Sequence, residues 1–279
     1  MKIAIIGSTG ILGTAFVEQS QVLGFEFEVF NRVDLANFET FERRVIAYKP
    51  DYCVCTIAIP SNRLCLVDPA KATLSNLSVP LSIARAMKKL KVKTCLFSSH
   101  GVFRPLNKLE YFYETCSPDS DTFYGILKIE LERTIADLSA SIFTMLRLPS
   151  LFGKRAHPGE KGACERILNA LILNQNIEVR SDMYDSYTLA NDVANFVLEN
   201  LEDISKETLL HFANEGIVSM AEFAEHAKTV IGSTSRISKT HDGSGRIYCS
   251  ALASNKKINN FQSNSCLDSL EKFARSFRL

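Results

Sequence analysis

A tyrosine and a lysine four residues apart have the clearest chemical potential in this sequence. Tyr124 and Lys128 form the only Tyr-x-x-x-Lys pair in the chain, and this spacing places both side chains on one face of a helix. A phenol has a pKa of about 10, and a neighbouring ammonium group favours the phenolate. Ser99, 25 residues earlier, could hydrogen-bond the same reacting oxygen. The three side chains therefore predict acid–base chemistry at an oxygen atom.

A glycine-rich turn indicates where a nucleotide would bind. Gly7, Gly10 and Gly13 form a G-x-x-G-x-x-G pattern between an apolar run, 3–6, and an amphipathic segment, 11–23. In this position the first glycine permits a tight turn, the second lets a pyrophosphate approach the backbone, and the third allows close helix–strand packing. The phosphates then lie at the helix N-terminus, where free N–H groups and the helix dipole favour anions. The turn predicts a dinucleotide site.

The end of the second predicted strand, 25–30, indicates which dinucleotide binds. A carboxylate there would bind the adenine ribose of NAD, whereas an arginine accommodates the 2′-phosphate of NADP. The strand is followed by Asn31 and Arg32, which favours NADPH, although Asp34 could still serve a ribose and NADH stays an alternative. The residues predicted to bind the cofactor are Gly7, Thr9, Gly10, Ile11, Leu12, Gly13, Asn31, Arg32, Asp34, Leu35, Ala58, Tyr124 and Lys128.

The order of predicted elements places these residues at one edge of a parallel sheet. Strands are predicted at 3–6, 25–30, 52–57, 94–97 and 142–146, and helices at 11–23, 38–48, 70–90 and 125–138. Strands that alternate with helices of this length indicate a parallel sheet covered by helices, with a ligand crevice at its carboxyl edge. We therefore predict an α/β fold with a Rossmann-type doubly wound parallel sheet.

The pattern changes after Pro149. Further helices are predicted at 163–173, 192–201, 219–230 and 267–277, and short strands at 177–179 and 209–213. We predict an NAD(P)-binding Rossmann domain over 1–150 and a smaller mixed α/β substrate-binding region over 151–279. A helix or strand of the second region could be exchanged into the first.

The glycine turn, Ser99 and the Tyr124–Lys128 pair, in this order, resemble the extended short-chain dehydrogenase/reductases. Within them the chain is similar to the dTDP-4-dehydrorhamnose reductase branch of nucleotide-sugar enzymes. The other matching stretches extend over nearly the whole chain: 49–51, Asn76, Val102-Phe103, Tyr113 with Glu114 and Pro118, Arg147 with Phe152-Gly153, 191–194 and 211–216.

The resemblance implies an NADPH-dependent reductase that transfers a hydride to the ketone of a nucleotide-activated 4-keto-6-deoxy sugar, in deoxysugar or surface-polysaccharide biosynthesis. It assigns Tyr124 as the general acid and Ser99 as a hydrogen-bond partner of the ketone oxygen. Lys128 would tune Tyr124 and hold the nicotinamide ribose. The partner it implies is a nucleotide-diphosphate sugar, and a homodimer is an alternative to a monomer.

Two departures from the family pattern leave the sugar open. Ser99-His100-Gly101 stands where the family usually has Thr-Asp-Tyr, and Ser150 stands where it tends to carry an aromatic residue, often tryptophan, which this chain lacks entirely. His100 titrates near neutrality and could contact substrate or relay a proton, or be an ordinary histidine at the rim. The residues expected to contact the substrate and its diphosphate, each alternatively a solvated surface group, are His100, Gly101, Ser150, Lys154, Arg155, Lys161 and Arg180.

Three alternative functions belong to the same superfamily. A dehydratase needs a carboxylate pair after the hydroxyl of the fourth strand, which 99–101 does not supply. A nucleotide-sugar epimerase with tightly bound NAD is not separable from a reductase on these residues. A non-catalytic NADP-binding regulatory relative would often have lost the tyrosine or the lysine, and both are present.

The composition excludes several classes of protein. The chain has 279 residues, 46% of them hydrophobic and 23% charged, which is unlike a disordered chain or a disulfide mini-scaffold. Its formal net charge of +1 gives no electrostatic reason to expect nucleic acid or an anionic membrane as partner. Eight scattered cysteines indicate reduced thiols and no metal site. With no signal-like or membrane-spanning apolar run, we expect a cytoplasmic protein.

Overall fold

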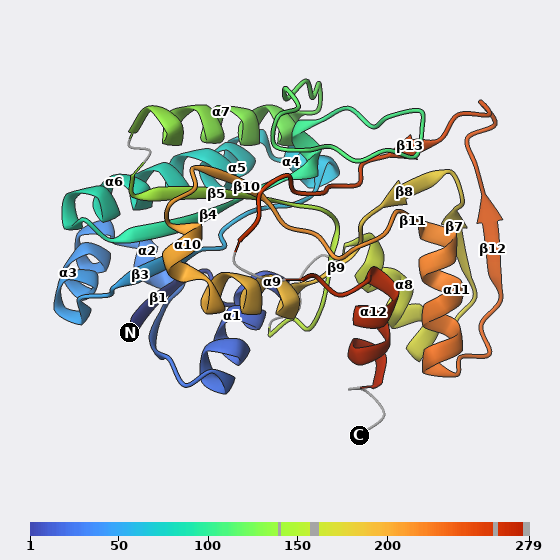
Figure 1. Cartoon of the computed structure of the whole chain (residues 1–279), viewed down its shortest axis with the longest axis horizontal. Helices are drawn as coiled ribbons and strands as arrows, with labels where there is room; N and C mark the ends of the chain where they lie inside the picture. Colours follow the sequence, from blue (N-terminus) through green and yellow to red (C-terminus); the bar gives the residue numbers. More distant parts are fainter. Residues whose placement is uncertain (139–140, 157–161, 259–261, 276–279) are drawn as a thin grey trace.

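A six-stranded parallel sheet forms the centre of the molecule (Figure 1). The computed structural model describes residues 1–138, 141–156, 162–258 and 262–275, except for the side chains of residues 32 and 33. In order across the sheet, the strands are β10 (Leu209–His211), β5 (Phe143–Leu148), β4 (Lys93–Ser99), β3 (Tyr52–Cys55), β1 (Lys2–Ile6) and β2 (Glu26–Phe30). Every pairing between them is parallel. This architecture confirms the predicted doubly wound α/β fold.

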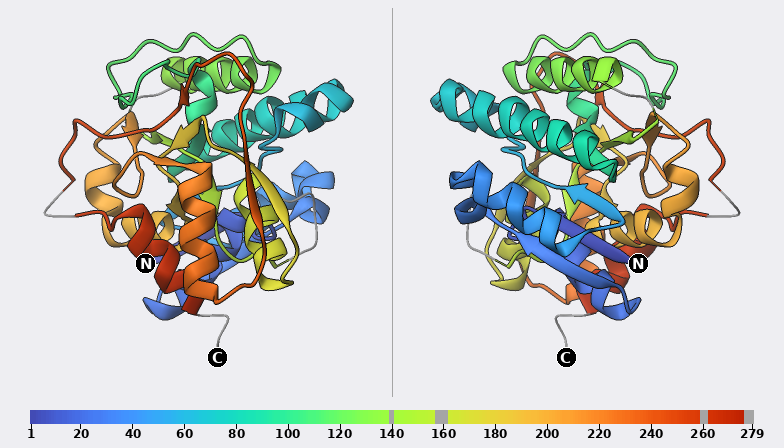
Figure 2. Two further views of the ribbon diagram at one scale, coloured as in Figure 1. Left: turned by 90° about the vertical axis from the view of Figure 1, so that its right-hand side faces the viewer. Right: turned by 90° about the vertical axis from the view of Figure 1, so that its left-hand side faces the viewer.

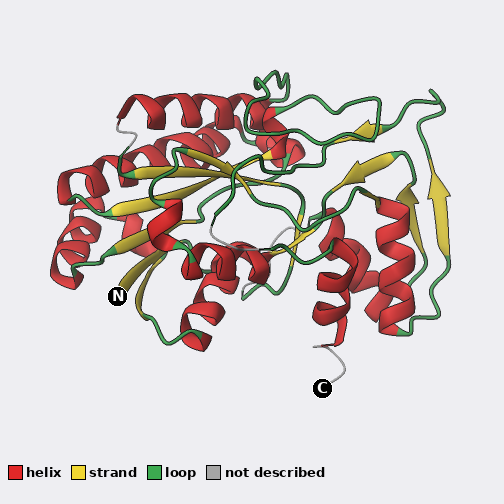
Figure 3. Ribbon diagram, viewed as in Figure 1, coloured by secondary structure: helices red, strands yellow, loops and turns green. Residues whose placement is uncertain are grey.

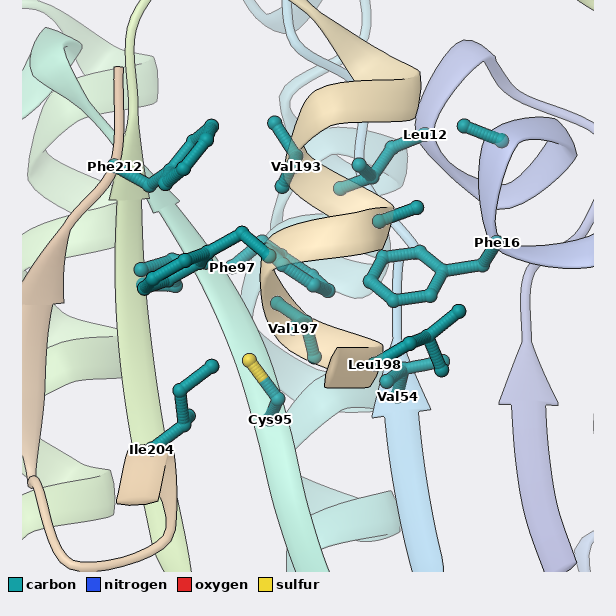
Figure 4. Packing of buried hydrophobic residues seen from close by; sticks show 14 of the residues in the cluster. Leu12, Phe16, Val54, Cys95, Phe97, Val193, Val197, Leu198, Ile204 and Phe212 are labelled. Atoms are coloured by element: carbon teal, nitrogen blue, oxygen red, sulfur yellow. The ribbon is translucent and has the colours of Figure 1, made fainter. Parts of the chain in front are cut away.

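Helices cover both faces of this sheet (Figure 3). On one face, α1 (Ile11–Val22) and α9 (Ala190–Glu199) pack over strand side chains that include Val54 and Phe97, as Figure 4 shows. The helices that pack on the opposite face are α3 (Phe38–Tyr48), α6 (Val79–Leu90) and α7 (Phe123–Leu138). Figure 2 shows α6 and α7 side by side. Because both faces are covered, the central strands are apolar almost throughout, which explains their short continuous hydrophobic runs.

A smaller group of elements lies beyond the sheet, on the right in Figure 1. Its helices are α8 (Ala163–Ile172), α11 (Met220–Ile231) and α12 (Cys266–Arg275). Its strands are β6 (Leu151–Phe152), β7 (Ile177–Arg180), β8 (Met183–Asp185), β9 (Thr188–Leu189), β11 (Val218–Ser219), β12 (Ile237–Thr240) and β13 (Tyr248–Cys249). These elements enclose a core of their own around the rings of Phe152, Phe223 and Phe273.

The chain returns from this group to the sheet. β10 pairs with β5, α9 packs on α1, and the short α10 (Leu201–Ile204) joins the core between them. A helix and a strand from beyond residue 150 therefore complete the layers of the first region, although the division at that residue stays a prediction. None of the described helices is both long and apolar enough to cross a membrane.

The stretch predicted as one helix over 70–90 is helical throughout, but it contains a π-helical turn that was not predicted. This stretch contains α5 (Pro69–Thr73), a π-helical turn η1 (Leu74–Ser78) and α6, and it follows an unpredicted helix, α4 (Asn62–Val67). Pro80 lies in the first turn of α6, where its missing N–H and its ring prevent a regular α-helical register upstream. The turn holds Asn76, which is fully buried and bonds both the N–H (2.9 Å) and the carbonyl (3.3 Å) of Ile59. The loop after β3 is thereby fixed.

A buried ion pair joins α7 to the sheet. The guanidinium of Arg147, on β5, donates to both carboxylate oxygens of Glu132, on α7, at 2.9 and 2.6 Å. The Arg147 side chain is only 3% exposed. On its other side, Nη1 lies 3.3 Å from Nε2 of His211, on β10. Burial lowers the pKa of His211, so the neutral ring accepts from Arg147 at Nε2 and donates from Nδ1 to backbone carbonyls. The network connects three elements.

We expect Glu132→Ala to lower the free energy of unfolding by about 3–5 kcal/mol, because it leaves the buried Arg147 cation without its counter-ion. Urea unfolding at neutral pH measures the difference. Glu130→Ala is the matched control on the same helix, since Glu130 is exposed and its loss should change stability by less than about 0.5 kcal/mol. Equal losses in the two variants would show that the pair contributes nothing.

Candidate active site

The glycine turn has the geometry that a bound pyrophosphate requires. Gly7 has a φ of +94°, and a Cβ there would lie 2.9 Å from Cγ1 of Ile57. A Cβ on Gly13 would lie 2.0 Å from the carbonyl oxygen of Gly7, so only glycine allows α1 to pack this close to the turn. A Cβ on Gly10, the N-cap of α1, would meet no atom within 4 Å. The helix N-terminus is therefore open to an anion.

The predicted cofactor residues differ in what they can offer a ligand. Thr9 is exposed at the turn and Ile11 is half-buried. The side chain of Leu12 packs in the core between the sheet and the helices α1 and α9, so only the backbone of this residue can face a ligand. Ala58 lies in the loop after β3 that Asn76 fixes. The strand order reverses at β1, between β2 and β3, which puts the turn at the crevice where doubly wound folds bind ligands.

The adenine-ribose end holds a cation that sequence reasoning missed. Asn31 accepts a hydrogen bond from the Ser8 hydroxyl at 2.8 Å. One oxygen of Asp34 accepts from the N–H of Asn31 at 2.7 Å and caps α2 (Arg32–Ala36), while the other forms an ion pair with Arg44. Arg44, on α3, also lies 2.5 Å from Glu28. Protein groups thus occupy both oxygens of Asp34.

Two further predicted residues complete this end. The side chain of Arg32 is not among those that the structure describes. Leu35 packs against the hydrophobic core that α3 covers. Arg44 stands twelve residues beyond Arg32 with no local pattern around it, so only the folded chain reveals that it reaches the end of β2.

The structure brings Ser99, Tyr124 and Lys128 together. Ser99 ends β4, and its hydroxyl lies near enough to that of Tyr124 to lower the pKa of the phenol, while it accepts from the N–H of Gly101 at 3.0 Å. Tyr124 and Lys128 lie in the first two turns of α7, with Nζ 5.9 Å from the tyrosine ring centroid. The Lys128 ammonium donates to the carbonyl of Phe97 at 2.9 Å. Gly101 faces the ring, since a Cβ there would lie 3.3 Å from it.

Burial dominates the electrostatics of this trio. It raises the pKa of Tyr124 to about 12, although the hydrogen bond from Ser99 acts in the opposite direction. Burial lowers the pKa of Lys128 to about 8. Negative charge on Cys55 and Glu132, when these groups are ionised, acts in the opposite direction and raises this pKa. At neutral pH Tyr124 is therefore a protonated phenol and Lys128 a cation. A phenol next to a buried cation can donate its proton to a developing oxyanion.

The residues predicted to bind substrate fall into separate places. Nδ1 of His100 lies 3.2 Å from the carboxylate of Asp185, at the end of β8, and the N–H of Ser150 donates to the same carboxylate at 3.1 Å. Sequence reasoning missed Asp185 because β8 is a three-residue strand without a periodic pattern. Lys154 is exposed, and Lys161 lies outside the described residues.

The two predicted arginines already have carboxylate partners. Arg155 pairs with both oxygens of Glu165, each at 2.9 Å. Arg180 pairs with Asp182 at 2.5 and 2.7 Å and lies 3.7 Å from Asp242. Their charges are therefore largely compensated within the protein.

A groove of about 520 Å³ runs along α8, β7 and β8. Its lining is apolar at Ile167, Val179 and Met183, and its charged members are Arg166, Glu178 and Arg180, the last already paired with Asp182. Met183 and Asp185 are two residues apart on β8, so they lie on one face of the strand about 7 Å apart. The groove therefore borders the strand that also carries Asp185.

Comparisons with known proteins agree with this arrangement. A family model described as "RmlD substrate binding domain" matches residues 1–246. No curated protein sequence matches the chain. The match to the family model confirms the predicted resemblance to nucleotide-sugar reductases among the extended short-chain dehydrogenase/reductases.

Solved structures share the fold at low sequence identity. A dTDP-4-dehydrorhamnose reductase of Clostridium acetobutylicum has 20% identity and a TM-score of 0.86, with 100% of both chains covered. The corresponding reductase of Bacillus anthracis, in complex with NADP, has 20% identity, 99% coverage of both chains and a TM-score of 0.86. A UDP-glucose 4-epimerase of Thermotoga maritima, with UDP-glucose, has 19% identity, a TM-score of 0.86, and coverage of 100% of this chain and 99% of its own.

From the extent of the family match, which spans the glycine turn, the trio of Ser99, Tyr124 and Lys128, and most of the second group of elements, the chain belongs to the RmlD substrate binding domain family.

Proposed function

We propose that the protein is an NADPH-dependent reductase of a nucleotide-activated 4-keto-6-deoxy sugar. The observation that carries this proposal is the convergence of Ser99, Tyr124 and Lys128 at the carboxyl edge of the sheet, which also holds the glycine turn. The proposed role is deoxysugar or surface-polysaccharide biosynthesis. A homodimer stays a prediction.

Each member of the trio has a separate task in the reduction. Bound NADPH would supply a hydride to the carbonyl carbon. Negative charge then accumulates on the carbonyl oxygen, to which Ser99 donates a hydrogen bond and Tyr124 transfers its hydroxyl proton. Lys128, a cation below a pH of about 8, lowers the free energy of the phenolate that forms. The lysine also holds its own position through the Phe97 carbonyl.

The state of Asp34 supports NADPH over NADH. A carboxylate binds the ribose diol of NAD through free oxygens, and both oxygens of Asp34 are engaged by the cap of α2 and by Arg44. Arg44 places a guanidinium at this end, although it is already paired with Glu28 and Asp34. The NADP found with the Bacillus anthracis reductase is consistent with this choice.

The groove along β8 suits the nucleotide of the substrate. Its apolar side chains can pack against a base, and Arg166 lies in its lining, whereas Arg180 is already paired with Asp182. The sugar would then extend along β8 toward His100 and Ser150, and its ketone would reach Tyr124.

Epimerisation is a second candidate, because the structural likeness to the Thermotoga maritima epimerase equals that to the reductases. An epimerase keeps its NAD tightly bound and returns the hydride, so it consumes no NADPH. A non-catalytic role has less support, since all three catalytic side chains are present and assembled.

A substrate panel separates these functions. We expect purified protein to oxidise NADPH with one member of a set of dTDP-, UDP- and GDP-linked 4-keto-6-deoxy sugars, followed by the loss of NADPH absorbance. Sugar isomers formed without NADPH consumption would instead identify an epimerase. A protein that binds NADPH and changes none of the sugars would be a non-catalytic relative.

We expect Tyr124→Phe to lower turnover by roughly 10²–10⁴-fold, because the variant lacks the hydroxyl that donates the proton. Fluorescence titration should show NADPH binding unchanged. Tyr48→Phe is the control, since Tyr48 ends α3 beside Lys2, at the amino end of the sheet. Wild-type turnover in Tyr124→Phe would rule out Tyr124 as the general acid.

We expect Lys128→Met to abolish turnover and yet raise the free energy of unfolding at pH 7 by about 1–3 kcal/mol, since the wild-type protein buries a cation. The pKa of Lys128 is lowered on folding, so wild-type stability rises between pH 8 and the ordinary lysine pKa of about 10.5, and the advantage of the variant shrinks there. Lys88→Met is the control, because Lys88 also donates to a carbonyl, that of Leu138, but is exposed. A less stable Lys128→Met would contradict the expected cost of burying the charge.

A further inference from the structure

His100 and Asp185 form a pair that the reduction does not use. Nδ1 of His100 lies 3.2 Å from a carboxylate oxygen of Asp185 and 3.3 Å from the carbonyl oxygen of Ser250. Both neighbours only accept hydrogen bonds, so Nδ1 carries a proton in either charge state of the ring. Nε2 has no hydrogen-bond partner among the described residues. The proton that His100 gains and loses is therefore the one on Nε2.

The imidazole belongs to the same turn as the catalytic serine. His100 begins a short 3₁₀ turn, η2 (His100–Val102), directly after Ser99, and a Cβ on Gly101 in that turn would lie 3.3 Å from the Tyr124 ring. The His100 side chain is 23% exposed, so Nε2 can meet a ligand in the site. The histidine thus lies at the same end of β4 as Ser99.

Asp185 is fixed firmly enough to orient a base. Its side chain is 5% exposed, and its oxygens accept from the N–H groups of Ser150, at 3.1 Å, and Ser186, at 2.9 Å. A carboxylate held in this way fixes the imidazole tautomer and stabilises the imidazolium, as in other acid–base sites that pair a histidine with an aspartate. Asp185 is therefore a positioning residue.

We propose that His100, positioned by Asp185, removes and returns a proton on the carbon next to the substrate ketone, so that the protein enolises its keto sugar as well as reducing it. The proposal rests on the proposed function, because it needs a keto sugar whose carbonyl oxygen reaches Ser99 and Tyr124. Enolisation of this kind is the first half of an epimerisation at that carbon.

The step is balanced without an added reactant. The C–H bond next to the carbonyl breaks, its proton forms a bond to Nε2 of His100, and its electron pair becomes the carbon–carbon double bond. The carbonyl electron pair moves onto oxygen, where Ser99 and Tyr124 hydrogen-bond the enolate. Reversal returns the proton from Nε2 to carbon. In D₂O, exchange at Nε2 puts deuterium on the sugar.

The electrostatic surroundings suit a base that works near neutral pH. Burial lowers the pKa of His100, but the charge of Asp185 and the hydrogen bonds to Asp185 and Ser250 more than offset this, and the pKa is raised above its ordinary 6.5. Tyr124 is neutral across this range because its pKa is about 12. The titratable groups that face Asp185 are the neutral Cys164, Tyr187 and Cys266, whose pKa values are raised by burial. The neutral imidazole, which is the base, forms as the pH rises through the raised pKa.

Deuterium exchange tests the proposal apart from reduction. The full-length protein is incubated with NADP⁺, which carries no hydride to transfer, and dTDP-4-dehydrorhamnose or its UDP- and GDP-linked counterparts in D₂O. NMR and mass spectrometry follow the loss of the protons next to the ketone. We expect exchange well above the enzyme-free rate, and a decrease of roughly 10²–10⁴-fold in His100→Gln. His226→Gln, which alters a histidine paired with Glu271 on the far helices, should exchange at the wild-type rate.

The pH dependence separates catalysis from a structural ion pair. The exchange rate should rise with pH through the ionisation of His100, and Asp185→Asn should move the midpoint to lower pH, because it removes the charge that raises the pKa. Should Asp185→Asn fail to fold, His100→Gln serves instead, since it should lack this ionisation altogether. A structural pair would change stability and leave the pH profile unchanged.

Each outcome decides one of the two proposals. Wild-type protein that oxidises NADPH with a sugar but does not exchange its protons overturns the enolisation and leaves the reductase. Wild-type exchange in His100→Gln does the same. Exchange without NADPH oxidation by any sugar supports the enolisation and overturns the reductase. Neither exchange nor oxidation with any sugar overturns both.

Discussion

The buried ion pair between Arg147 and Glu132 determines where α7 lies on the sheet. Tyr124, Lys128 and Glu132 follow one another at four-residue intervals, so they lie along one face of α7. Because Arg147 is fixed in β5 and bonds Glu132 through two nitrogen atoms, the helix can neither rotate nor slide without breaking a largely buried contact. The position of the phenol at the end of β4 therefore depends on a contact two helical turns away.

This anchoring allows Lys128 to be buried without a carboxylate in direct contact. Its ammonium bonds a neutral carbonyl, and Glu132 acts on it only at longer range. A carboxylate in contact would hold the positive charge more tightly and would compete with the phenolate for it. With a carbonyl partner, the charge of Lys128 is directed at Tyr124 when the proton leaves the phenol. Burying the Lys128 cation costs free energy, so α7 must be held firmly against the sheet. The Arg147–Glu132 ion pair holds it there.

Local spacing predicted that Ser99, Tyr124 and Lys128 come together and that the glycine turn precedes a helix, whereas contacts between distant segments could not be predicted. Helical periodicity placed Tyr124 and Lys128 on one face, and the strand–turn–helix order placed Gly7 and Gly13, because these features depend on neighbouring residues. Asp185 could not be found in this way, since it meets His100 across distant segments.

The other misses have the same physical origin. Arg44 reaches the end of β2 only in the folded chain, and the π-helical turn depends on how Pro80 disrupts the helix above it. The basic residues predicted for a diphosphate show the same limit, because sequence does not reveal that Arg155 and Arg180 already have carboxylate partners.

The histidine at position 100 can be explained by its contact with Asp185. A carboxylate at that position, as the family pattern has it, would face Asp185 with a second negative charge, and at about 4 Å such a pair repels by about 1–4 kcal/mol. An imidazole instead supplies Asp185 with a third hydrogen-bond donor, beside the N–H groups of Ser150 and Ser186. Histidine instead of aspartate at position 100 is therefore compatible with the buried carboxylate of Asp185 on β8. A sugar bound here would meet a titratable nitrogen, where the family pattern would present a carboxylate.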